Sequence, residues 1–324
     1  MAASTVQVDV HLGPADLTAA LLEEARVGLG SQPKALSPKW LYDERGCDLF
    51  DQITRLDEYY PFRRERSILQ ARAATIAEAT GADTLVELGS GTSEKTRLLL
   101  DALAGAGTLE RFVPFDVSEP TLREAAGAII AEHPCIAVHA VVGDFEHHLD
   151  RLPGGGRRLI AFLGGTIGNL EPDLRAAFLR EISAGMGPDD ALLLGTDLVK
   201  DTSRLVRAYD DAEGVTAAFN KNVLAVLNRE LGADFDLDGF DHVACYDDER
   251  DRIEMRLRAR HATSVVVEAL ATTVTFEAGE EVRTEISAKF TRPLVEADLA
   301  AAGLGLDAWW TDDDGDFALS LSRR

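Results

Sequence analysis

Cysteine is scarce in this chain, and long hydrophobic runs are missing. Its 324 residues include three cysteines, Cys47, Cys135 and Cys245, which lie far apart and form no Cys-x-x-Cys pair. Their odd number and wide spacing argue against a disulfide framework and against a cysteine-based zinc site. No apolar run approaches the roughly 18 residues that a membrane-spanning helix requires, so the sequence predicts no such segment.

Positive charge is also in short supply. Lysine and arginine number 33 against 56 aspartates and glutamates, which gives a formal net charge of −23. Nucleic acids and anionic membranes both need a basic binding surface, so neither is expected as a partner. The first residues, MAASTVQVDVHLGP, have neither the basic start nor the apolar segment of an export signal. We therefore expect a cytoplasmic protein, and we expect it to be a monomer.

The middle third of the chain alternates apolar runs with helical segments. Strands that alternate with helices of this length are typical of a doubly wound α/β domain with a parallel sheet. Ligands of such sheets bind at the carboxyl ends of the strands. The apolar runs are residues 84–91, 112–118, 137–145, 158–170 and 191–199.

After about residue 201 the pattern changes. Residues 202–231 favour two helices, and strict alternation of apolar and charged residues follows at 252–260. Residues 264–290 favour two strands joined by a turn near Ala278 and Gly279. Adjacent strands with a tight turn indicate antiparallel pairing outside the central sheet.

The N-terminal stretch to about Tyr60 shows helical segments and no strand pattern. It is therefore a candidate to pack with the C-terminal part. We predict a Rossmann-like domain over residues 61–200 and a discontinuous α+β domain made of residues 1–60 and 201–324.

The string VELGSGTSEK, residues 86–95, follows the first predicted strand. Gly89 and Gly91 allow a sharp turn and the close approach of a nucleotide, with a helix expected from about Thr92 or Ser93. A dinucleotide-binding fingerprint would place a third glycine at position 94, where this chain has Glu94. A carboxylate suits a pyrophosphate poorly, so the string favours S-adenosylmethionine (SAM) over a nicotinamide cofactor.

Two further strand ends carry matching side chains. Asp116 lies 25 residues beyond Gly91 and is suited to accept hydrogen bonds from both ribose hydroxyls. Asp144 can accept from the adenine amino group, and Phe145 can stack on the adenine ring. The alternative is a purely structural role, in which the glycines only form a turn and the aspartates cap helices. Together the three strand ends favour a class I methyltransferase.

The fourth strand end reads LGGTIGN and carries Asn169. It lacks the Pro-Pro-Tyr or Pro-Pro-Phe element of many amino-methyltransferases. No convincing acidic metal-ligand set is found there, and the seven histidines show no i, i+4 spacing, so no metal is expected.

Seven strings resemble the SAM-dependent L-histidine Nα-methyltransferase family of ergothioneine biosynthesis, and the resemblance runs from about Pro33 to the C-terminus. It implies a Rossmann-like methyltransferase domain with a substrate domain made from both chain ends. It also implies that three methyl groups pass from SAM to the α-amine of L-histidine, giving hercynine and S-adenosylhomocysteine. The strings are KWLYDERGCDLFDQITRLDEYYP, VELGSGTSEK, FLGGTIGNL, LLGTDLVKD, RAYDDAEGVTAAFN, TEISAKF and WWTDDDGDF.

The resemblance assigns the site residue by residue. Gly165 departs from it, since the family has serine there. Cofactor contacts fall on Tyr42, Gly89, Lys95, Asp116, Asp144 and Phe145, and histidine contacts fall on Tyr59, Asn169, Tyr209, Met255, Glu285 and Ser287.

Glu285 and Ser287 lie two apart on a predicted strand, so both face the same side, about 6–7 Å from each other. A carboxylate beside a hydroxyl can hold the two nitrogens of an imidazole ring. Ile286 is counted with them as a substrate-binding candidate, although its side chain is expected to face the other way. The alternative is a solvated strand face that also includes Arg283 and Lys289.

The catalytic candidates are Tyr42, Tyr59 and Asn169. The α-amine must lose a proton before it attacks the methyl group, and either tyrosine or water can accept that proton. Two other functions stay open: N-methylation of another small amino acid or amine, and a SAM-binding module without turnover. A nicotinamide oxidoreductase is disfavoured by Glu94.

Overall fold

The computed structural model describes residues 6–91 and 93–324. By its internal contacts the chain divides into two compact units. Unit 1 contains the described residues up to Gly13, together with Pro61–Leu198 and Phe290–Arg324. Unit 2 contains Pro14–Tyr60 and Val199–Lys289.

Unit 1 is built on an eight-stranded sheet in the order β1-β5-β4-β3-β6-β7-β14-β13. The strands from β1 to β7 run parallel, and β14 pairs antiparallel with both β7 and β13. The chain leaves β3 toward β4 and later returns to β3's other side as β6, so the topological switch point lies at β3. The strands are β1 (Val6–Val10), β3 (Thr84–Leu88), β4 (Arg111–Asp116), β5 (Ala137–Val142), β6 (Arg158–Phe162), β7 (Ala191–Asp197), β13 (Gly305–Thr311) and β14 (Phe317–Arg323).

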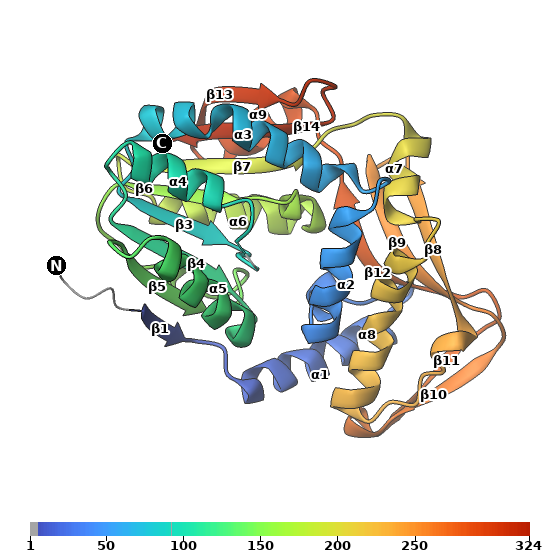
Figure 1. The fold of residues 1–324 in the computed structure, drawn as a ribbon. Helices are drawn as coiled ribbons and strands as arrows, with labels where there is room; N and C mark the ends of the chain where they lie inside the picture. The colour runs from blue at the N-terminus through green and yellow to red at the C-terminus, as the bar shows by residue number, and fades with distance from the viewer. Residues whose placement is uncertain (1–5, 92) are drawn as a thin grey trace. The chain divides into compact units, whose positions relative to one another are not determined.

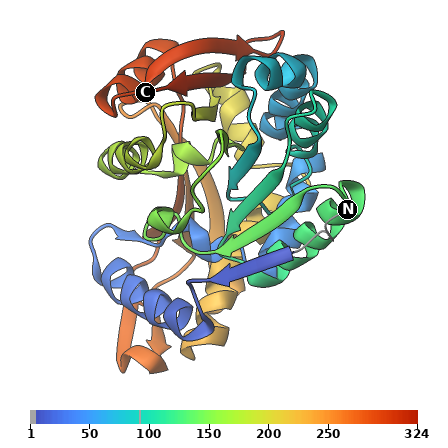
Figure 2. The ribbon, with the colours of Figure 1, turned by 90° about the vertical axis from the view of Figure 1, so that its left-hand side faces the viewer.

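The central strands are apolar throughout because helices cover both faces of this sheet (Figures 1 and 2). Every residue of β3, β6 and β7 is buried. The predicted doubly wound α/β fold is therefore confirmed. The helices of unit 1 are α3 (Tyr60–Thr80), α4 (Arg97–Gly105), α5 (Glu119–Glu132), α6 (Pro172–Gly185) and α9 (Arg292–Ala301), with short 3-10 turns η2 (Leu149–Arg151) and η3 (Thr166–Asn169). The first residue of α3, Tyr60, is counted with unit 2.

The helix after the glycine turn starts later than the sequence indicates. Ser93 has a backbone φ of +53°, which is not helical, and α4 begins at Arg97. Thr92, the other expected start, lies outside the described residues. Within residues 6–91 and 93–324, no helix combines the length and apolarity needed to cross a membrane.

Both ends of the chain differ from the predicted domain assignment. β1 pairs in parallel with β5, so the N-terminal stretch does contain a strand of the large sheet. β14 pairs along its length with β7, and β13 with β14, so residues 290–324 also lie in unit 1 (Figure 2). The sequence analysis gave both segments to the other domain. The reason is long-range strand pairing, which local patterns do not encode.

Unit 2 contains a four-stranded sheet in the order β2-β12-β9-β8 and a separate β10-β11 hairpin. Antiparallel pairing of β12 with β9 and of β9 with β8 confirms a second sheet of the expected kind. One detail was wrong: the strands on either side of Gly279 do not pair, since β11 pairs with β10 instead. The strands are β2 (Lys34–Ala35), β8 (Phe240–Asp247), β9 (Arg252–Ala259), β10 (Thr263–Val267), β11 (Thr272–Phe276) and β12 (Glu281–Ala288).

Helices α7 and α8 pack against β8 and β9 of this sheet, and α2 and η1 pack on α8. Gly214 separates α7 from α8, as predicted, and adopts a left-handed φ of +75°. The helices of unit 2 are α1 (Pro14–Gly30), α2 (Glu44–Arg55), α7 (Thr202–Tyr209) and α8 (Val215–Leu231), with 3-10 turns η1 (Pro38–Leu41), η4 (Leu237–Gly239) and η5 (Glu268–Leu270).

Candidate active site

The carboxyl ends of β3 and β4 are tied together by backbone hydrogen bonds. The N–H groups of Gly89 and Ser90 both donate to the carbonyl oxygen of Phe115, at 2.9 and 3.1 Å. Gly89 and Gly91 have φ values of +69° and +47°, a region that favours glycine. The glycine turn therefore has the sharp backbone that the sequence predicts.

Asp116 joins three of these strand ends. One carboxylate oxygen accepts from Gly91 N–H at 2.9 Å, and the other accepts from Ser118 N–H at 3.0 Å. Its carbonyl oxygen accepts from Gly143 N–H after β5. Burial raises the pKa of the Asp116 carboxyl, while these backbone bonds oppose the rise. A carboxylate has about four acceptor positions, so it can still accept from ribose hydroxyls.

Glu87 holds the loop after β3 through hydrogen bonds to its side chains, a role that the sequence analysis missed. It is buried in β3, and one of its oxygens accepts from the hydroxyls of Ser90 and Ser93, at 2.7 and 2.9 Å. Thr96 donates to the other oxygen. Burial raises the pKa of Glu87 to about 7. The serines and threonine of this loop thus serve to hold its shape.

The third strand end carries the two predicted adenine contacts. Asp144 is buried, and its carboxylate accepts from Glu146 N–H at 2.9 Å. The Phe145 ring packs edge-on against Phe162 and Phe178, with centroids 5.5 and 5.7 Å apart. Both neighbours fix the orientation of a half-exposed ring, as an adenine-stacking role requires.

Lys95 is held by a buried glutamate that the sequence analysis did not single out. Glu65 of α3 is fully buried, pairs with Lys95 Nζ, and accepts from Gly164 N–H with both oxygens, at 2.8 and 2.9 Å. A Cβ on Gly195 would lie 2.1 Å from a Glu65 oxygen, so glycine there leaves room for this carboxylate. Glu65 thereby links α3 to the loops after β3 and β6.

Asn169 lies at the end of η3, directly after this loop. Gly164 and Gly165 precede it with φ values of +81° and +70°. The serine that the family has at position 165 would be strained in this backbone conformation, and glycine relieves that strain. Asn169 is half-buried.

In unit 2, five aromatic rings form a cluster that includes three predicted site residues. Tyr59 packs edge-on against Tyr209 at 6.2 Å, and Phe50 lies between Tyr59 and Tyr42 at 6.0 and 5.4 Å. Phe219 of α8 packs against Tyr42 at 5.2 Å. The structure thus brings these tyrosines together from η1, α2, α7 and their flanking turns.

The Glu285 carboxylate and the Ser287 hydroxyl are buried, at 7% and 5% exposure. Met255 lies opposite Glu285 on β9 and is 1% exposed. Tyr209 donates its hydroxyl hydrogen to Ser287 Oγ at 2.7 Å. Among the described residues, Glu285 Oε2 has no hydrogen-bond partner. An unpaired buried carboxylate oxygen is costly, which suggests that a ligand satisfies it.

The solvated-face alternative for this strand is wrong. Lys289 is 1% exposed, and a register shift between Arg283 and Glu285 breaks the alternation. Ile286 pairs with Glu254, whose side chain belongs to the opposite face of the sheet. That position is the one expected from alternation, so Ile286 does not share the face of its two neighbours.

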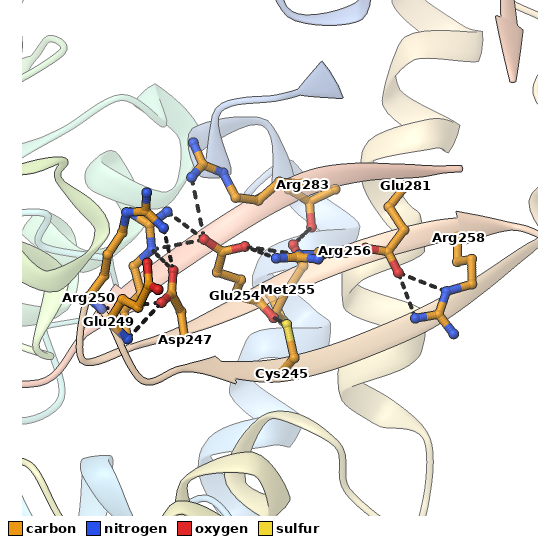
Figure 3. Close-up of polar contacts among 12 residues, drawn as sticks. Cys245, Asp247, Glu249, Arg250, Glu254, Met255, Arg256, Arg258, Glu281 and Arg283 are labelled. Carbon is orange, nitrogen blue, oxygen red and sulfur yellow. Dashed lines mark hydrogen bonds and ion pairs between the residues drawn. The ribbon is translucent and has the colours of Figure 1, made fainter. Parts of the chain in front are cut away.

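The opposite face carries a charged network of its own (Figure 3). Glu254 accepts from Arg252 and Arg256, and Glu281 accepts from Arg256 and Arg258 at 2.7 Å. These carboxylates are fully engaged with arginines. Over residues 6–91 and 93–324, Glu285 has no arginine partner, so the two faces of this sheet differ in how their carboxylates are paired.

The predicted site residues are divided between the two units, and the division does not coincide with their predicted roles, since Tyr42 of the cofactor set lies in unit 2 and Asn169 of the histidine set lies in unit 1. Gly89, Lys95, Asp116, Asp144, Phe145 and Asn169 belong to unit 1, while Tyr42, Tyr59, Tyr209, Met255, Glu285 and Ser287 belong to unit 2. Burial raises the pKa of Tyr42 well above its usual value, and the nearby Glu285 charge raises it further. A phenol of this kind stays protonated, which weakens the case for Tyr42 as the base.

The pH dependence of stability tests the environment of Glu285. Burial raises its pKa to about 7 from 4.5, with Lys289 opposing the rise. Below about pH 4.5 this carboxyl is protonated in both the folded and the unfolded chain and costs no stability. Between about pH 4.5 and 7 it ionises only in the unfolded chain, so stability falls over this range, and the loss is complete above about pH 7. The stability of Glu285→Gln relative to wild type is therefore expected to rise between about pH 4.5 and 7, by up to about 3 kcal/mol, and to stay constant above about pH 7. Urea unfolding of both proteins without ligand measures this, and a pH-independent difference would contradict it.

A family model and the similar known proteins agree on one family for this chain. The model of a family described as "Histidine-specific methyltransferase, SAM-dependent" matches residues 21–324. The histidine N-alpha-methyltransferase of Mycolicibacterium smegmatis is 60% identical over 320 residues, covering 99% of this chain and 100% of that protein. The Mycobacterium tuberculosis protein of the same name is 59% identical over 319 residues, covering 98% and 99%. Ergothioneine biosynthesis protein 1 of Neurospora crassa is 31% identical over 288 residues, covering 86% of this chain and 32% of that protein.

Proposed function

Because the chain belongs to the family of SAM-dependent histidine-specific methyltransferases, we propose that it transfers three methyl groups from SAM to the α-amine of L-histidine. The products are hercynine, as a step in ergothioneine biosynthesis, and S-adenosylhomocysteine. The observation that carries the substrate assignment is a buried Glu285 oxygen that lies beside the Ser287 hydroxyl and finds no hydrogen-bond partner in the part of the chain that the structure describes. A carboxylate and a hydroxyl together match the two ring nitrogens of histidine.

The cofactor residues have the chemistry that SAM requires. Asp116 keeps acceptor capacity for the ribose hydroxyls, and Phe145 offers a ring held by two neighbouring phenylalanines. Asp144 can accept from the adenine amino group. Lys95 can neutralise the methionyl carboxylate of SAM, for which its present partner Glu65 competes. No phosphate group has to be accommodated beside Glu94.

Orientation supplies most of the catalysis. The sulfonium of SAM is already activated, and aligning nitrogen, methyl carbon and sulfur can contribute on the order of 7–11 kcal/mol. We assign Tyr59, Tyr209 and Asn169 to the amino-acid end of histidine, and Met255 to contact with the ring. Burial keeps the Tyr42 phenol protonated, so we do not assign it as the base. Tyr59 or water then accepts the amine proton.

Mass spectrometry of the reaction tests the proposal. Purified protein incubated with SAM and L-histidine should give products heavier by one, two and three methyl groups. In a mixture of twenty amino acids, histidine should dominate the methylated products. Dominance of another amino acid would favour the second candidate function. Tight SAM binding in calorimetry with no methyl transfer to any of the twenty would favour a non-catalytic module.

The proposal includes a cytoplasmic monomer, as the sequence analysis expects. Light scattering coupled to size-exclusion chromatography measures the mass in solution, and twice the chain mass would contradict the monomer.

A further inference from the structure

Glu65 is a buried carboxylate of unit 1 to which the proposed function gives no role of its own. Its side chain, on α3, is fully buried, and one of its oxygens pairs with Lys95 Nζ. Both of its oxygens accept from Gly164 N–H, at 2.8 and 2.9 Å. Charged groups are rarely buried this deeply unless they are paired. Glu65 therefore joins the loop after β3, which carries Lys95, to the loop after β6, which carries Gly164.

The large sheet leaves space for this carboxylate at one position of β7. A Cβ on Gly195 would overlap Glu65 Oε1, and glycine is the residue that lacks this atom. Gly195 lies inside a strand, where glycine weakens the sheet and often marks the close approach of another group. The position of the carboxylate is thus determined by two elements, α3 and β7.

The Lys95 ammonium is held by two side chains of α3 that lie one turn apart. Glu65 pairs with it, and the centre of the Phe62 ring lies 5.1 Å from its Nζ. The lysine side chain is 13% exposed. Removing the carboxylate partner of a largely buried cation is costly, so Lys95 without Glu65 is expected to turn toward solvent. Glu65 therefore determines where the ammonium lies.

The position of the ammonium suits a ligand at the switch point of the sheet. A Cβ on Gly164 would lie 3.8 Å from Lys95 Nζ, so this group lies against the loop after β6 although it comes from the loop after β3. Ligands of doubly wound sheets bind where the loops of such strands meet. An ammonium has three N–H donors, and the bond to Glu65 uses one of them. Lys95 can therefore keep Glu65 and still donate to a ligand carboxylate.

Glu87 is a second carboxylate near Lys95, and its partners are different. Burial raises the pKa of Glu87 to about 7, and the Lys95 charge opposes this rise. The oxygens of Glu87 accept from three hydroxyls of the loop after β3. These bonds hold Glu87 within its own loop. Glu65 is the carboxylate that pairs with the ammonium, so it is the group expected to set the position of Lys95.

We propose that Glu65 is a positioning residue that fixes Lys95 for the methionyl carboxylate of SAM and of S-adenosylhomocysteine. This inference rests on the proposed function, which gives that carboxylate to Lys95. Glu65 also competes with the ligand carboxylate for the ammonium. The fixed position outweighs this competition, because an unfixed lysine side chain loses its rotamer freedom only when the ligand binds.

Glu65→Gln tests the proposal with two ligands that differ at the methionyl end. S-adenosylhomocysteine has the carboxylate, whereas 5′-methylthioadenosine keeps the adenosine and the thioether and lacks the amino-acid end. The glutamine oxygen can still accept from Gly164 N–H, but the amide carries no charge to pair with Lys95. Calorimetry should show affinity for S-adenosylhomocysteine lower by about 10-fold or more. Affinity for 5′-methylthioadenosine should stay within about twofold of wild type.

Asp190→Asn is the matched control. Asp190 is also a buried carboxylate of unit 1, but it pairs with Arg158 at the amino ends of β6 and β7. This variant should leave both affinities unchanged even if it lowers stability. Three results in Glu65→Gln would overturn the proposal: equal losses for the two ligands, an unchanged affinity for S-adenosylhomocysteine, or the gain expected if competition for Lys95 dominated.

A double-variant cycle shows whether Glu65 acts through Lys95. Lys95→Met should itself lower affinity for S-adenosylhomocysteine and spare 5′-methylthioadenosine. Adding Glu65→Gln to Lys95→Met should change affinity for S-adenosylhomocysteine by less than about twofold, because the group that Glu65 fixes is already gone. A further loss as large as that of Glu65→Gln alone would overturn the proposal.

Gly195→Ala displaces the carboxylate while leaving it in the chain, since the added Cβ overlaps Glu65 Oε1. It should reproduce the ligand-selective loss of Glu65→Gln. An affinity for S-adenosylhomocysteine equal to that of wild type would contradict the positioning role.

A further measurement does not depend on the folding of a variant that lacks Glu65. Nitrogen NMR of the lysine ammonium groups in wild-type protein, with Lys95 assigned by its loss in Lys95→Arg, should show slow exchange with water before any ligand is added. The Lys95 signal should shift with S-adenosylhomocysteine and not with 5′-methylthioadenosine. Free exchange of this ammonium without ligand would overturn the role of Glu65. Absence of S-adenosylhomocysteine binding to wild type would instead reject the proposed function, so the two failures are distinguishable.

Discussion

Replacing Glu285 with alanine is expected to weaken L-histidine binding by about 10- to 150-fold, while SAM binding changes by less than about twofold. The expected loss corresponds to one hydrogen bond to a charged group, about 1.5–3 kcal/mol. Glu285 is buried, and its Oε2 has no partner among the described residues, so a ligand bond there has no internal competitor. Calorimetry with each ligand separately measures both affinities, with S-adenosylhomocysteine present in the histidine titration.

Glu281→Ala provides the matched control on the same strand. Glu281 accepts from Arg256 and Arg258 on the opposite face of the sheet (Figure 3). Its removal should leave histidine affinity unchanged even if it lowers stability. Equal losses of histidine and SAM affinity in Glu285→Ala, or a similar histidine loss in Glu281→Ala, would contradict the assigned role.

Asp116→Ala is expected to have the reverse selectivity, with SAM affinity falling by about 10- to 150-fold or more and histidine affinity changing little. Two effects add here. The variant loses the acceptor for the ribose hydroxyls, and it also loses the bonds that hold Gly91 and Ser118. Fluorescence or calorimetric titration with SAM measures the change.

Asp116→Asn separates the two effects because the amide keeps one oxygen acceptor for the loop but cannot accept at both positions. Its SAM affinity should lie between those of wild type and Asp116→Ala. Asp101→Ala, on the exposed surface of α4 at 70% side-chain exposure, is the control for loss of an acidic residue and should bind SAM as wild type does. Unchanged SAM affinity in both Asp116 variants would remove Asp116 from the cofactor site.

Residues that act through local geometry were predictable from the sequence. Gly89 and Gly91 predict a turn because they directly follow an apolar run and glycine readily adopts the positive φ values that a sharp turn needs. The structure contains this turn. Asp116 and Gly143 follow predicted strands, and parallel strands bring their carboxyl ends to one edge of the sheet, where the two residues are hydrogen-bonded. Resemblance to a family then supplied roles that spacing alone left open, as for Met255.

Residues that act through distant contacts were not predictable in this way. Glu65 sits in a helix among arginines and reads as an ordinary surface residue, yet it is buried against Gly164, which lies 99 positions away in the chain. Lys289 had a usable signal, since alternation puts it on the side of Glu285 and Ser287. Its burial decides between a solvated face and a buried cluster with Ser287 and Tyr209, and burial depends on what the rest of unit 2 places above the strand.

The amino-acid sequence by itself determined the class of fold, the glycine turn and the set of side chains that suit SAM and histidine, because these follow from short-range periodicity and from chemical type. Only the tertiary structure decided that β1 and residues 290–324 complete the large sheet, and that Lys289 is buried with Ser287 and Tyr209. The physical reason is that strand pairing and burial are formed by segments far apart in the chain. Each segment's local pattern is compatible with several partners, and the partner is chosen when the whole chain packs.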